Sequence, residues 1–166
     1  MPDHNITKYN DQLETSDYNK LKNVTLEIEK NIDKDHILEQ HFYYLGKIRA
    51  FYAFRDKEED ALDETIEACK QQIAMADKAL QGFIDDHNNR ITEMKEMDAE
   101  LGIDSGFAEE DAGDPVIPSH TGYQQLATIY RKQKKYKEAI EMCEQALKQG
   151  WVGDWEKRIE KDSKKL

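Results

Sequence analysis

The stretch GYQQLATIYRKQKKYKEAIEMCEQALKQGW, residues 122–151, decides the fold of this 166-residue chain. Apolar and small residues recur in it at steps of three and four, which is the spacing of one face of a helix. The segment KQKKYK in its middle interrupts that spacing and predicts a tight turn. We therefore predict two antiparallel helices here, at 122–134 and about 137–149.

Three alanines mark where these two helices should touch. Ala127 lies on the first helix, and Ala139 and Ala146 lie on the second. Helix axes approach to about 8 Å only where the contact rows carry short side chains, and large neighbours then fill the space around the crossing. The alanine pattern therefore predicts helix packing and not chemistry.

These positions resemble the tetratricopeptide repeat (TPR) family. In that motif a large residue is followed by Leu, a small residue and Tyr in the first helix, and by Ala, an aromatic residue, Ala and Pro in the second. Here the series is Tyr123, Leu126, Ala127, Tyr130, Ala139, Cys143, Ala146 and Trp151. Cys143 replaces the aromatic residue and Trp151 replaces the proline. The resemblance covers residues 119–152.

A second, degenerate copy is predicted around residues 42–80. The segment TIEACKQQI at 65–73 aligns with AIEMCEQAL at 139–147, and IRAFY at 48–52 aligns with LATIY at 126–130. The two copies lie 74–78 residues apart, which is about twice the usual repeat length. Residues 82–118 therefore either form an aberrant middle hairpin or interrupt the array with a long helix and a loop.

The predicted fold is all-α, with antiparallel helical hairpins of the TPR-like superhelix type. One such hairpin cannot bury its apolar face alone, so neighbours must stack on it. A short helix that begins after Asp154 should cap the C-terminal end, and Trp155, Ile159 and Leu166 give it a rough apolar face. A helix at 17–32 is expected to cover the other end.

The domain organisation follows from the same patterns. Residues 1–16 are polar and irregular and are expected to be loose, and 17–166 should form one all-helical domain interrupted by an acidic loop at 102–118. A helix from about His36 to Phe54 should be central because its apolar residues cover much of its surface. Gly82 and the Asn88-Asn89 pair predict a break or kink near 82–90.

Helix starts can be predicted from capping patterns. Ser16 or Asp17 is expected to cap the helix that ends near Ile32. Asp56 followed by Glu59 has the spacing of an N-cap with a partner three residues on. Thr121 followed by Gln124 repeats that spacing before the helix of the clear repeat.

Charge excludes some classes of partner. The chain is 36% charged and carries a formal net charge of −11, which would repel nucleic acid. The balance is uneven, because residues 131–166 hold 11 Lys and Arg against 7 Asp and Glu. This basic C-terminal end could meet an acidic partner, although a solvated helical surface is the simpler interpretation.

Membrane association and an oxidising compartment are not predicted. No stretch approaches the ~20 apolar residues that a membrane span needs, and the first residues lack the apolar core of a signal peptide. Cys69 and Cys143 are the only cysteines, and both fall in helical patterns, so we interpret them as small apolar fillers in a reducing cytoplasm.

Patterns that carry catalysis or bind cofactors are missing from the sequence. There is no phosphate-binding glycine loop, nucleophile elbow or paired-histidine zinc helix. His36 and His41 are five residues apart and would diverge around a helix. The acidic loop lacks the alternation and central glycine of a calcium site. We therefore predict no catalytic residue, no metal and no cofactor, and a protein that is not an enzyme.

The resemblance to TPR proteins implies a module that binds another protein. Members usually hold a peptide or helix on the concave surface lined by the first helix of each hairpin. By position, the partner-binding residues implied in this chain are Gln124, Thr128, Arg131 and Lys132 in the clear repeat, and Tyr43, Lys47 and Phe54 in the degenerate copy. Aromatic rings beside cations would suit a segment with apolar and acidic residues. Alternatively, Tyr43 and Phe54 belong to the core, and Arg131 and Lys132 are solvated.

Two other functions remain open from the sequence. One is an acidic inhibitor or regulator that docks on a basic surface of a target protein, using the loop at 102–114. The other is a helical helper domain of an enzyme, with no chemistry of its own. Self-association into a homo-oligomer is also possible, because a single clear repeat offers only a short groove.

Overall fold

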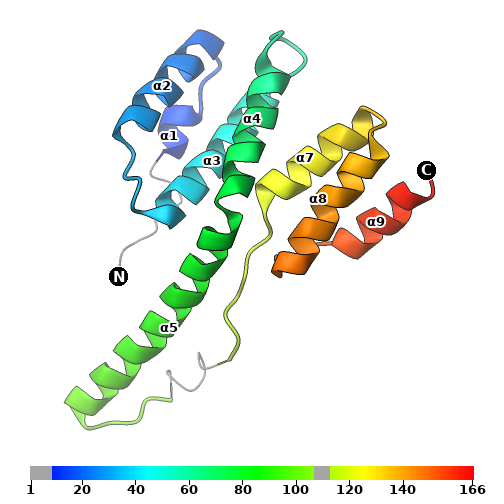
Figure 1. Cartoon of the computed structure of the whole chain (residues 1–166). Coiled ribbons are helices and arrows are strands. Elements are labelled where there is room, and N and C mark those ends of the chain that lie inside the picture. Colours follow the sequence, from blue (N-terminus) through cyan, green and yellow to red (C-terminus); the bar gives the residue numbers. More distant parts are fainter. Residues whose placement is uncertain (1–8, 107–112) are drawn as a thin grey trace.

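The computed structural model describes residues 9–106 and 113–166, and the regular elements in those ranges are all α-helices (Figure 1). This confirms the predicted all-α fold of packed helical hairpins. The helices are α1 (Asn10–Leu13), α2 (Tyr18–Asn31), α3 (Ile37–Tyr52), α4 (Ala61–Ala74), α5 (Ala76–Leu101), α7 (Thr121–Lys132), α8 (Tyr136–Gln149) and α9 (Trp155–Ser163).

Helices α7 and α8 form the predicted C-terminal hairpin. Ala127, Ala139 and Ala146 are all buried between packed helices, as their small size predicted. The turn between the helices passes through Lys134, which has a positive φ of 61°. Lys135 N–H donates to the Tyr130 carbonyl at 2.8 Å and closes the end of α7.

Helix α9 covers the open side of this hairpin, as predicted for a C-terminal cap. Trp155 is the anchor: only 1% of its surface is exposed, and its indole N–H donates to the Trp151 carbonyl at 2.7 Å. Ile159 packs against the same core, whereas Leu166 is exposed. The predicted apolar face therefore ends at Ile159.

Helices α3 and α4 form a second hairpin that stacks on the first through α4 and α7 (Figure 1). Leu126 of α7 shares a core with Ile48 of α3 and with Cys69 of α4. Gln72 of α4 joins the two hairpins by donating to the His41 carbonyl at 2.9 Å and accepting from Gly122 N–H at 2.7 Å. The second hairpin occupies the position of the degenerate copy.

In the described parts of residues 82–118 a long helix is followed by irregular segments at 102–106 and 113–118, which agrees with the second of the two alternatives. Helix α5 runs unbroken for 26 residues after a break at Met75, and the predicted break near 82–90 is wrong. A Cβ at Gly82 would lie 3.1 Å from Leu38 Cδ2. Gly82 thus permits a close contact with α3 and does not end the helix.

The distal half of α5 projects from the body (Figure 1). No residue from 88 to 105 is buried. We call residues 88–105 the arm. It ends its helix at Gly102, which has a positive φ of 63° and forms the left-handed C-cap. The expected acidic loop follows, although residues 107–112 of it lie outside the described parts of the chain.

The N-terminal helices cover the far side of α3. Asp17 caps α2 by accepting from Lys20 N–H at 3.1 Å, as predicted. Residues 1–8 lie outside the described residues, and residues 10–13 of the segment expected to be loose form α1. Leu13 of α1 is buried, and a Cβ at Gly46 of α3 would lie only 2.9 Å from its Cδ1 atom. Gly46 is the position that lets α1 pack closely.

Two of the predicted caps are wrong. Helix α4 begins at Ala61 after Asp60, and not at the Asp56–Glu59 pair. The Asp60 carboxylate accepts from the Tyr18 hydroxyl at 2.7 Å and from Lys22 Nζ at 2.6 Å, so it fastens α2 to the start of α4.

Helix α7 is capped by His120, and not by the Thr121–Gln124 pair. The His120 Nδ1 atom accepts from Tyr123 N–H at 3.1 Å. Histidine was not considered as a cap, because Ser, Thr, Asp and Asn dominate that position. Asp154 does precede α9 as predicted, but its carboxylate binds Arg158 instead of a backbone N–H.

Candidate protein-binding groove

A groove of about 510 Å³ lies between α7 and α9. Its lining is dominated by cationic side chains, although the whole chain is acidic. The lining residues are Ala127, Thr128, Arg131, Lys132, Tyr136, Asp154, Lys157, Arg158, Lys161, Asp162 and Lys165. Six of these are Lys or Arg and two are Asp, so the groove carries a formal charge of +4.

The α7 wall of the groove is fixed to α9 by an ion pair. Arg131 Nε lies 3.0 Å from Asp162 Oδ1. The Asp162 side chain is 4% exposed, whereas that of Arg131 is 37% exposed. The pair therefore closes the groove on its inner side and leaves one edge of the guanidinium accessible to water.

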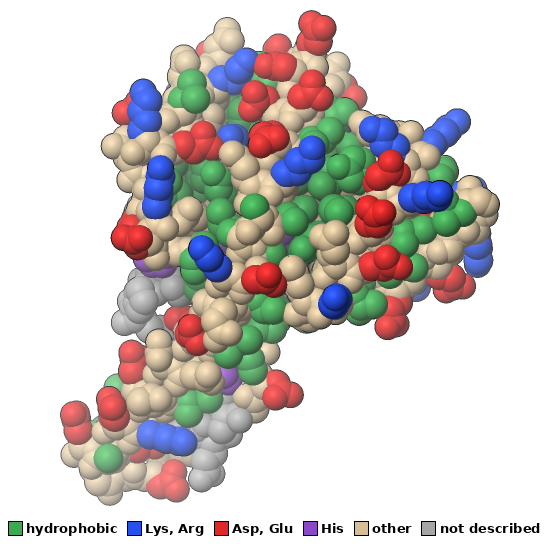
Figure 2. All heavy atoms as spheres, in the orientation of Figure 1, with side chains coloured by type: hydrophobic (Ala, Val, Ile, Leu, Met, Phe, Trp, Pro, Cys, Tyr) green, Lys and Arg blue, Asp and Glu red, His purple; other side chains and the backbone are tan. Residues whose placement is uncertain are grey.

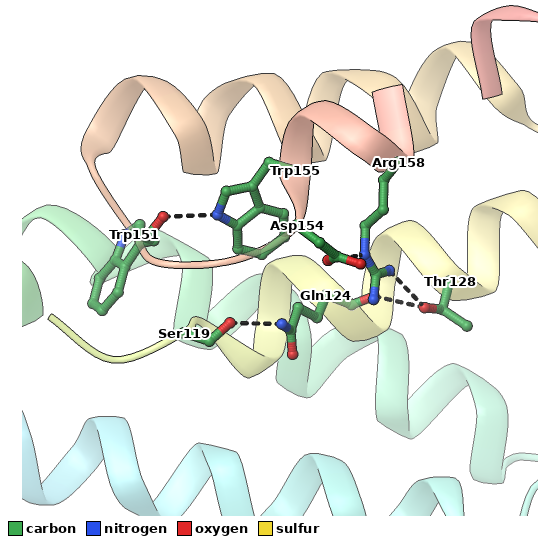
Figure 3. Close-up of polar contacts among 7 residues, drawn as sticks. All are labelled: Ser119, Gln124, Thr128, Trp151, Asp154, Trp155 and Arg158. Carbon is green, nitrogen blue, oxygen red and sulfur yellow. Dashed lines mark hydrogen bonds and ion pairs between the residues drawn. The ribbon is translucent and has the colours of Figure 1, made fainter. Parts of the chain in front are cut away.

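A second arginine bridges the two helices at the other end of the groove (Figure 3). Arg158 Nε donates to Asp154 Oδ1 at 2.7 Å, and Nη1 donates to Thr128 Oγ1 at 3.3 Å. The Thr128 hydroxyl in turn donates to the Gln124 carbonyl at 2.8 Å. The hydrogen bond from Arg158 lowers the pKa of Asp154, so this carboxylate stays ionised at neutral pH.

Three exposed lysines give the α9 side its charge. Lys157 and Lys161 lie on α9, and Lys165 follows just beyond its end. Lys157 and Lys161 share one face of α9 because they lie four residues apart, and Lys165 continues this stripe along the groove beyond the helix end. None of them makes an ion pair with the described residues. Both groove carboxylates are held by arginines, so these lysines are available to a ligand.

An aromatic ring adjoins the groove at the C-terminal end of α7. Lys132 Nζ donates to the hydroxyl of Tyr52, the last residue of α3, at 3.0 Å. The guanidinium carbon of Arg55 lies 4.2 Å from the centroid of the same ring. The Tyr52 ring thus places apolar surface between two cations.

A family model described as tetratricopeptide repeat matches residues 121–149. The chain carries a tetratricopeptide repeat. The matched span coincides with α7 and α8, and α3 and α4 lie outside it. No curated protein and no solved structure matches the chain.

Three of the four binding residues expected from the tetratricopeptide repeat meet in the groove. Thr128, Arg131 and Lys132 line its α7 wall. Gln124 is half-buried and donates to Ser119 Oγ at 2.6 Å (Figure 3). Gln124 therefore supports the start of α7 and does not line the groove.

Two of the residues expected from the degenerate copy are buried, so their predicted place on an open surface is wrong. Tyr43 is 1% exposed, and its hydroxyl donates to the Thr25 carbonyl of α2 at 3.4 Å. Burial raises the pKa of Tyr43, so its hydroxyl stays protonated. Lys47 is 6% exposed and forms an ion pair with Glu29 of α2 at 2.7 Å. Both residues are covered because α2 packs on this face of α3.

Phe54 is half-buried and lies outside the α7–α9 groove. Its ring packs against that of Tyr18, with centroids 5.1 Å apart. It lines a separate cleft of about 420 Å³ between α1 and the end of α3. The degenerate copy and the clear repeat therefore do not form one continuous lined surface.

The α9 wall of the groove was missed by sequence reasoning. Lys157, Arg158, Lys161 and Lys165 lie beyond the repeat pattern, so transfer by position could not reach them. Two signals were present: the positive balance of residues 131–166, and the spacing of four between successive lysines. Together they predict a cationic face on the capping helix.

The two cysteine thiols are sequestered in the core. Cys69 and Cys143 are buried and free, and burial raises the pKa of their thiols to about 12 and about 11. Among residues 9–106 and 113–166, no group of three His, Cys, Asp or Glu side chains is placed to hold a metal ion. In those same ranges no helix combines the length and the apolar character that crossing a membrane requires.

Proposed function

We propose that this protein is an interaction module that binds an acidic segment of a partner protein in the groove between α7 and α9. Tetratricopeptide repeats act in general as protein–protein interaction modules and are generally not enzymes. The observation that carries the proposal is the charge of the groove. Its lining contains six cations and two carboxylates, and both carboxylates form ion pairs with arginines.

The shape of the groove suits a short peptide or a helical segment. Helix α9 has nine residues and is therefore about 13 Å long, which corresponds to four extended residues or to two or three helical turns of a ligand. The small side chains of Ala127 and Thr128 leave room on the α7 wall. The Tyr52 ring would receive an apolar side chain beside the acidic ones.

Binding through exposed lysines should depend strongly on salt. Interactions between exposed charges are screened beyond about 8 Å at physiological ionic strength. Complementary charge mainly increases the association rate and the discrimination between partners. We therefore expect a ligand selected by charge and held in register by Arg131 and Arg158, whose positions are fixed by Asp162 and Asp154.

A cytoplasmic location is part of the proposal. Cys69 and Cys143 are both free thiols in the core, on different hairpins. They act as small apolar residues at helix contacts, as a reducing compartment permits.

The test is the binding of a fluorescent acidic peptide that also carries Leu and Phe, measured by fluorescence anisotropy with about 1 µM protein. Lys157→Glu combined with Lys161→Glu should weaken binding at least tenfold, since reversing two ligand-facing charges removes about 1.4 kcal/mol or more. A basic peptide of equal length should not bind.

The matched control places the same change of charge outside the groove. Lys137 and Lys148 are exposed on α8 and do not line the groove, so Lys137→Glu combined with Lys148→Glu should change affinity less than twofold. Equal losses in the two double variants would show that only net charge matters and would overturn the groove assignment.

A further inference from the structure

The arm, residues 88–105, consists of the amphipathic end of α5 and the four residues that follow it, and it has an acidic character. Its last helical turns carry apolar residues at steps of three and four: Ile91, Met94, Met97 and Leu101. Met97 and Leu101 are 60% and 63% exposed, and Ile103 just beyond them is 53% exposed. Isolated large apolar side chains are common on surfaces, but a continuous stripe of them indicates an interaction site.

Acidic residues lie along one edge of this apolar stripe. At 100° per residue, Glu93, Glu96 and Glu100 lie side by side along the arm, next to the apolar residues. The whole arm contains five carboxylates, including Asp98 and Asp104, and two basic residues, so its formal charge is −3. Figure 2 shows acidic side chains around the projecting part of the molecule.

The arm has little to stabilise it within one copy of the chain. Isolated helices of about 12–15 residues are marginal in water, because most helical stability in proteins comes from packing an apolar face. The helical part of the arm, residues 88–101, contains no buried residue. Ile91 and Met94 are half-buried, but the exposed end of the stripe, Met97 and Leu101, is available to a partner that would bury it.

We propose that the arm of one copy binds in the α7–α9 groove of a second copy, so that the protein associates head to tail. This inference rests on the proposed function, because the groove is the same. The charges are complementary, with −3 on the arm and +4 in the groove. Pairing of two arms would instead bring two surfaces of −3 together.

The spacing of the charges also matches. Glu93 and Glu100 are about 10 Å apart along the arm, and Lys157 and Lys165 are about 12 Å apart along the direction of α9, from a rise of 1.5 Å per residue. Glu96 lies between Glu93 and Glu100, and Lys161 likewise lies between Lys157 and Lys165. An arm laid alongside α9 can therefore pair three carboxylates with three lysines that have no ion-pair partner among the described residues.

The contact must form between copies. Figure 1 shows the arm and α9 at opposite sides of the body, with the arm directed away from it. Each copy thus offers one arm and one groove in different places. Such a heterologous contact closes into a ring or extends into a chain of copies.

The experiment is sedimentation velocity of the full-length protein across about 5–500 µM, at low salt and at about 0.5 M salt. Two charge-reversal variants are compared with the unmodified protein. The arm variant is Glu93→Lys/Glu96→Lys/Glu100→Lys, and the groove variant is Lys157→Glu/Lys161→Glu/Lys165→Glu. The control variant is Glu141→Lys/Glu144→Lys, on the exposed face of α8 outside both surfaces.

The unmodified protein and the control should associate as concentration rises, and association should weaken at least tenfold at high salt. Each reversal variant alone should stay monomeric at concentrations where the unmodified protein associates. An equimolar mixture of the two should associate again, because the basic arm then meets an acidic groove and the acidic arm a basic one. This recovery also proves that both variants are folded.

Two outcomes would overturn the inference. The first is an unmodified protein that stays monomeric at 500 µM. The second is a groove variant that still self-associates, which would assign the contact to arm–arm pairing. The peptide assay separates this failure from a failure of the proposed function: an arm variant that binds the acidic peptide keeps the groove as a binding site even if no copies associate.

Discussion

The two helical hairpins of this protein differ in the exposure of their first helices. In the first hairpin, the outer face of α3 is covered by α2, and Tyr43 and Lys47 are buried there. In the second, α9 stands away from part of α7, and the face that carries Thr128, Arg131 and Lys132 borders an open groove. The difference shows that the covering helix decides which hairpin can bind a ligand.

The same residue type therefore plays different roles in the two hairpins. Burying a cation is costly unless a carboxylate accompanies it, and Glu29 of α2 supplies that carboxylate for Lys47. Lys132 of α7 stays exposed, and its ammonium group contacts the Tyr52 hydroxyl and ring face. The lysine of α3 is part of the core, and the lysine of α7 is free to exchange its contact for a ligand.

The largest effect is expected from removing the anchor of α9. Trp155→Ala should lower the free energy of unfolding by about 3–5 kcal/mol, because it deletes a fully buried indole from the main core. It should also abolish binding of the acidic peptide, since α9 provides half of the groove. Urea unfolding and fluorescence anisotropy measure the two effects.

Trp155→Phe is the graded control for that experiment. It keeps an aromatic ring in the core but removes the N–H that donates to the Trp151 carbonyl at 2.7 Å. A loss of about 1–2 kcal/mol with peptide binding retained is expected. If Trp155→Ala kept full peptide affinity, α9 would not form the second wall of the site.

The next effect concerns the junction between the two hairpins, where α3 packs against the start of α7. His41 of α3 and His120 at the start of α7 are both buried, with ring centroids 5.5 Å apart. The Trp151 ring stacks on His41 and meets His120 edge to face. Burial lowers the pKa of His41 to about 4, and burial together with His41 lowers that of His120 to about 3.

Acid should therefore destabilise the folded protein through this junction. Unfolded histidines take up protons near pH 6.5, whereas the folded ones resist protonation until about pH 4 and pH 3. Between pH 6.5 and 4 the unfolded state binds more protons, so the free energy of unfolding falls as pH falls. We expect a loss on the order of 3 kcal/mol between pH 6.5 and 5, measured by urea unfolding at several pH values.

A variant without these imidazoles provides the comparison. His41→Phe combined with His120→Asn keeps an aromatic ring at the first site and an N-cap acceptor at the second. Its free energy of unfolding should depend much less on pH over the same interval. A pH dependence identical to that of the unmodified protein would show that these two imidazoles are not the source of the acid sensitivity.

Packing was predictable from the sequence because it depends on local spacing. Ala127, Ala139 and Ala146 fixed the second hairpin through their size alone, and the capping helix was found from Trp155 and Ile159. The break near 82–90 was predicted wrongly because glycine propensity ignores contacts. Gly82 is held in the helix by its close approach to Leu38, which lies 44 residues away in sequence.

Exposure was harder to predict, because it depends on helices that are distant in sequence. The repeat pattern places Tyr43 on an exposed face of α3. Nothing in the sequence around Tyr43 shows that α2 will cover that face. Likewise, the stripe of Lys157, Lys161 and Lys165 becomes a groove wall only when Trp155 sets α9 beside α7. The α9 wall of the groove could therefore be identified only from the arrangement of the helices in space.

The smallest effect tests the two lysines directly. Lys47→Met should lower the free energy of unfolding by about 2 kcal/mol, because it leaves the partly buried Glu29 carboxylate without its cation. Lys132→Met removes only an exposed contact and should change stability by less than about 0.5 kcal/mol. For peptide affinity the order should reverse, with a several-fold loss for Lys132→Met and none for Lys47→Met. The contrary result is a loss of affinity in proportion to the loss of stability in both variants. The effect of each lysine would then follow from overall stability alone, and the covered and the open hairpin faces would not be functionally distinct.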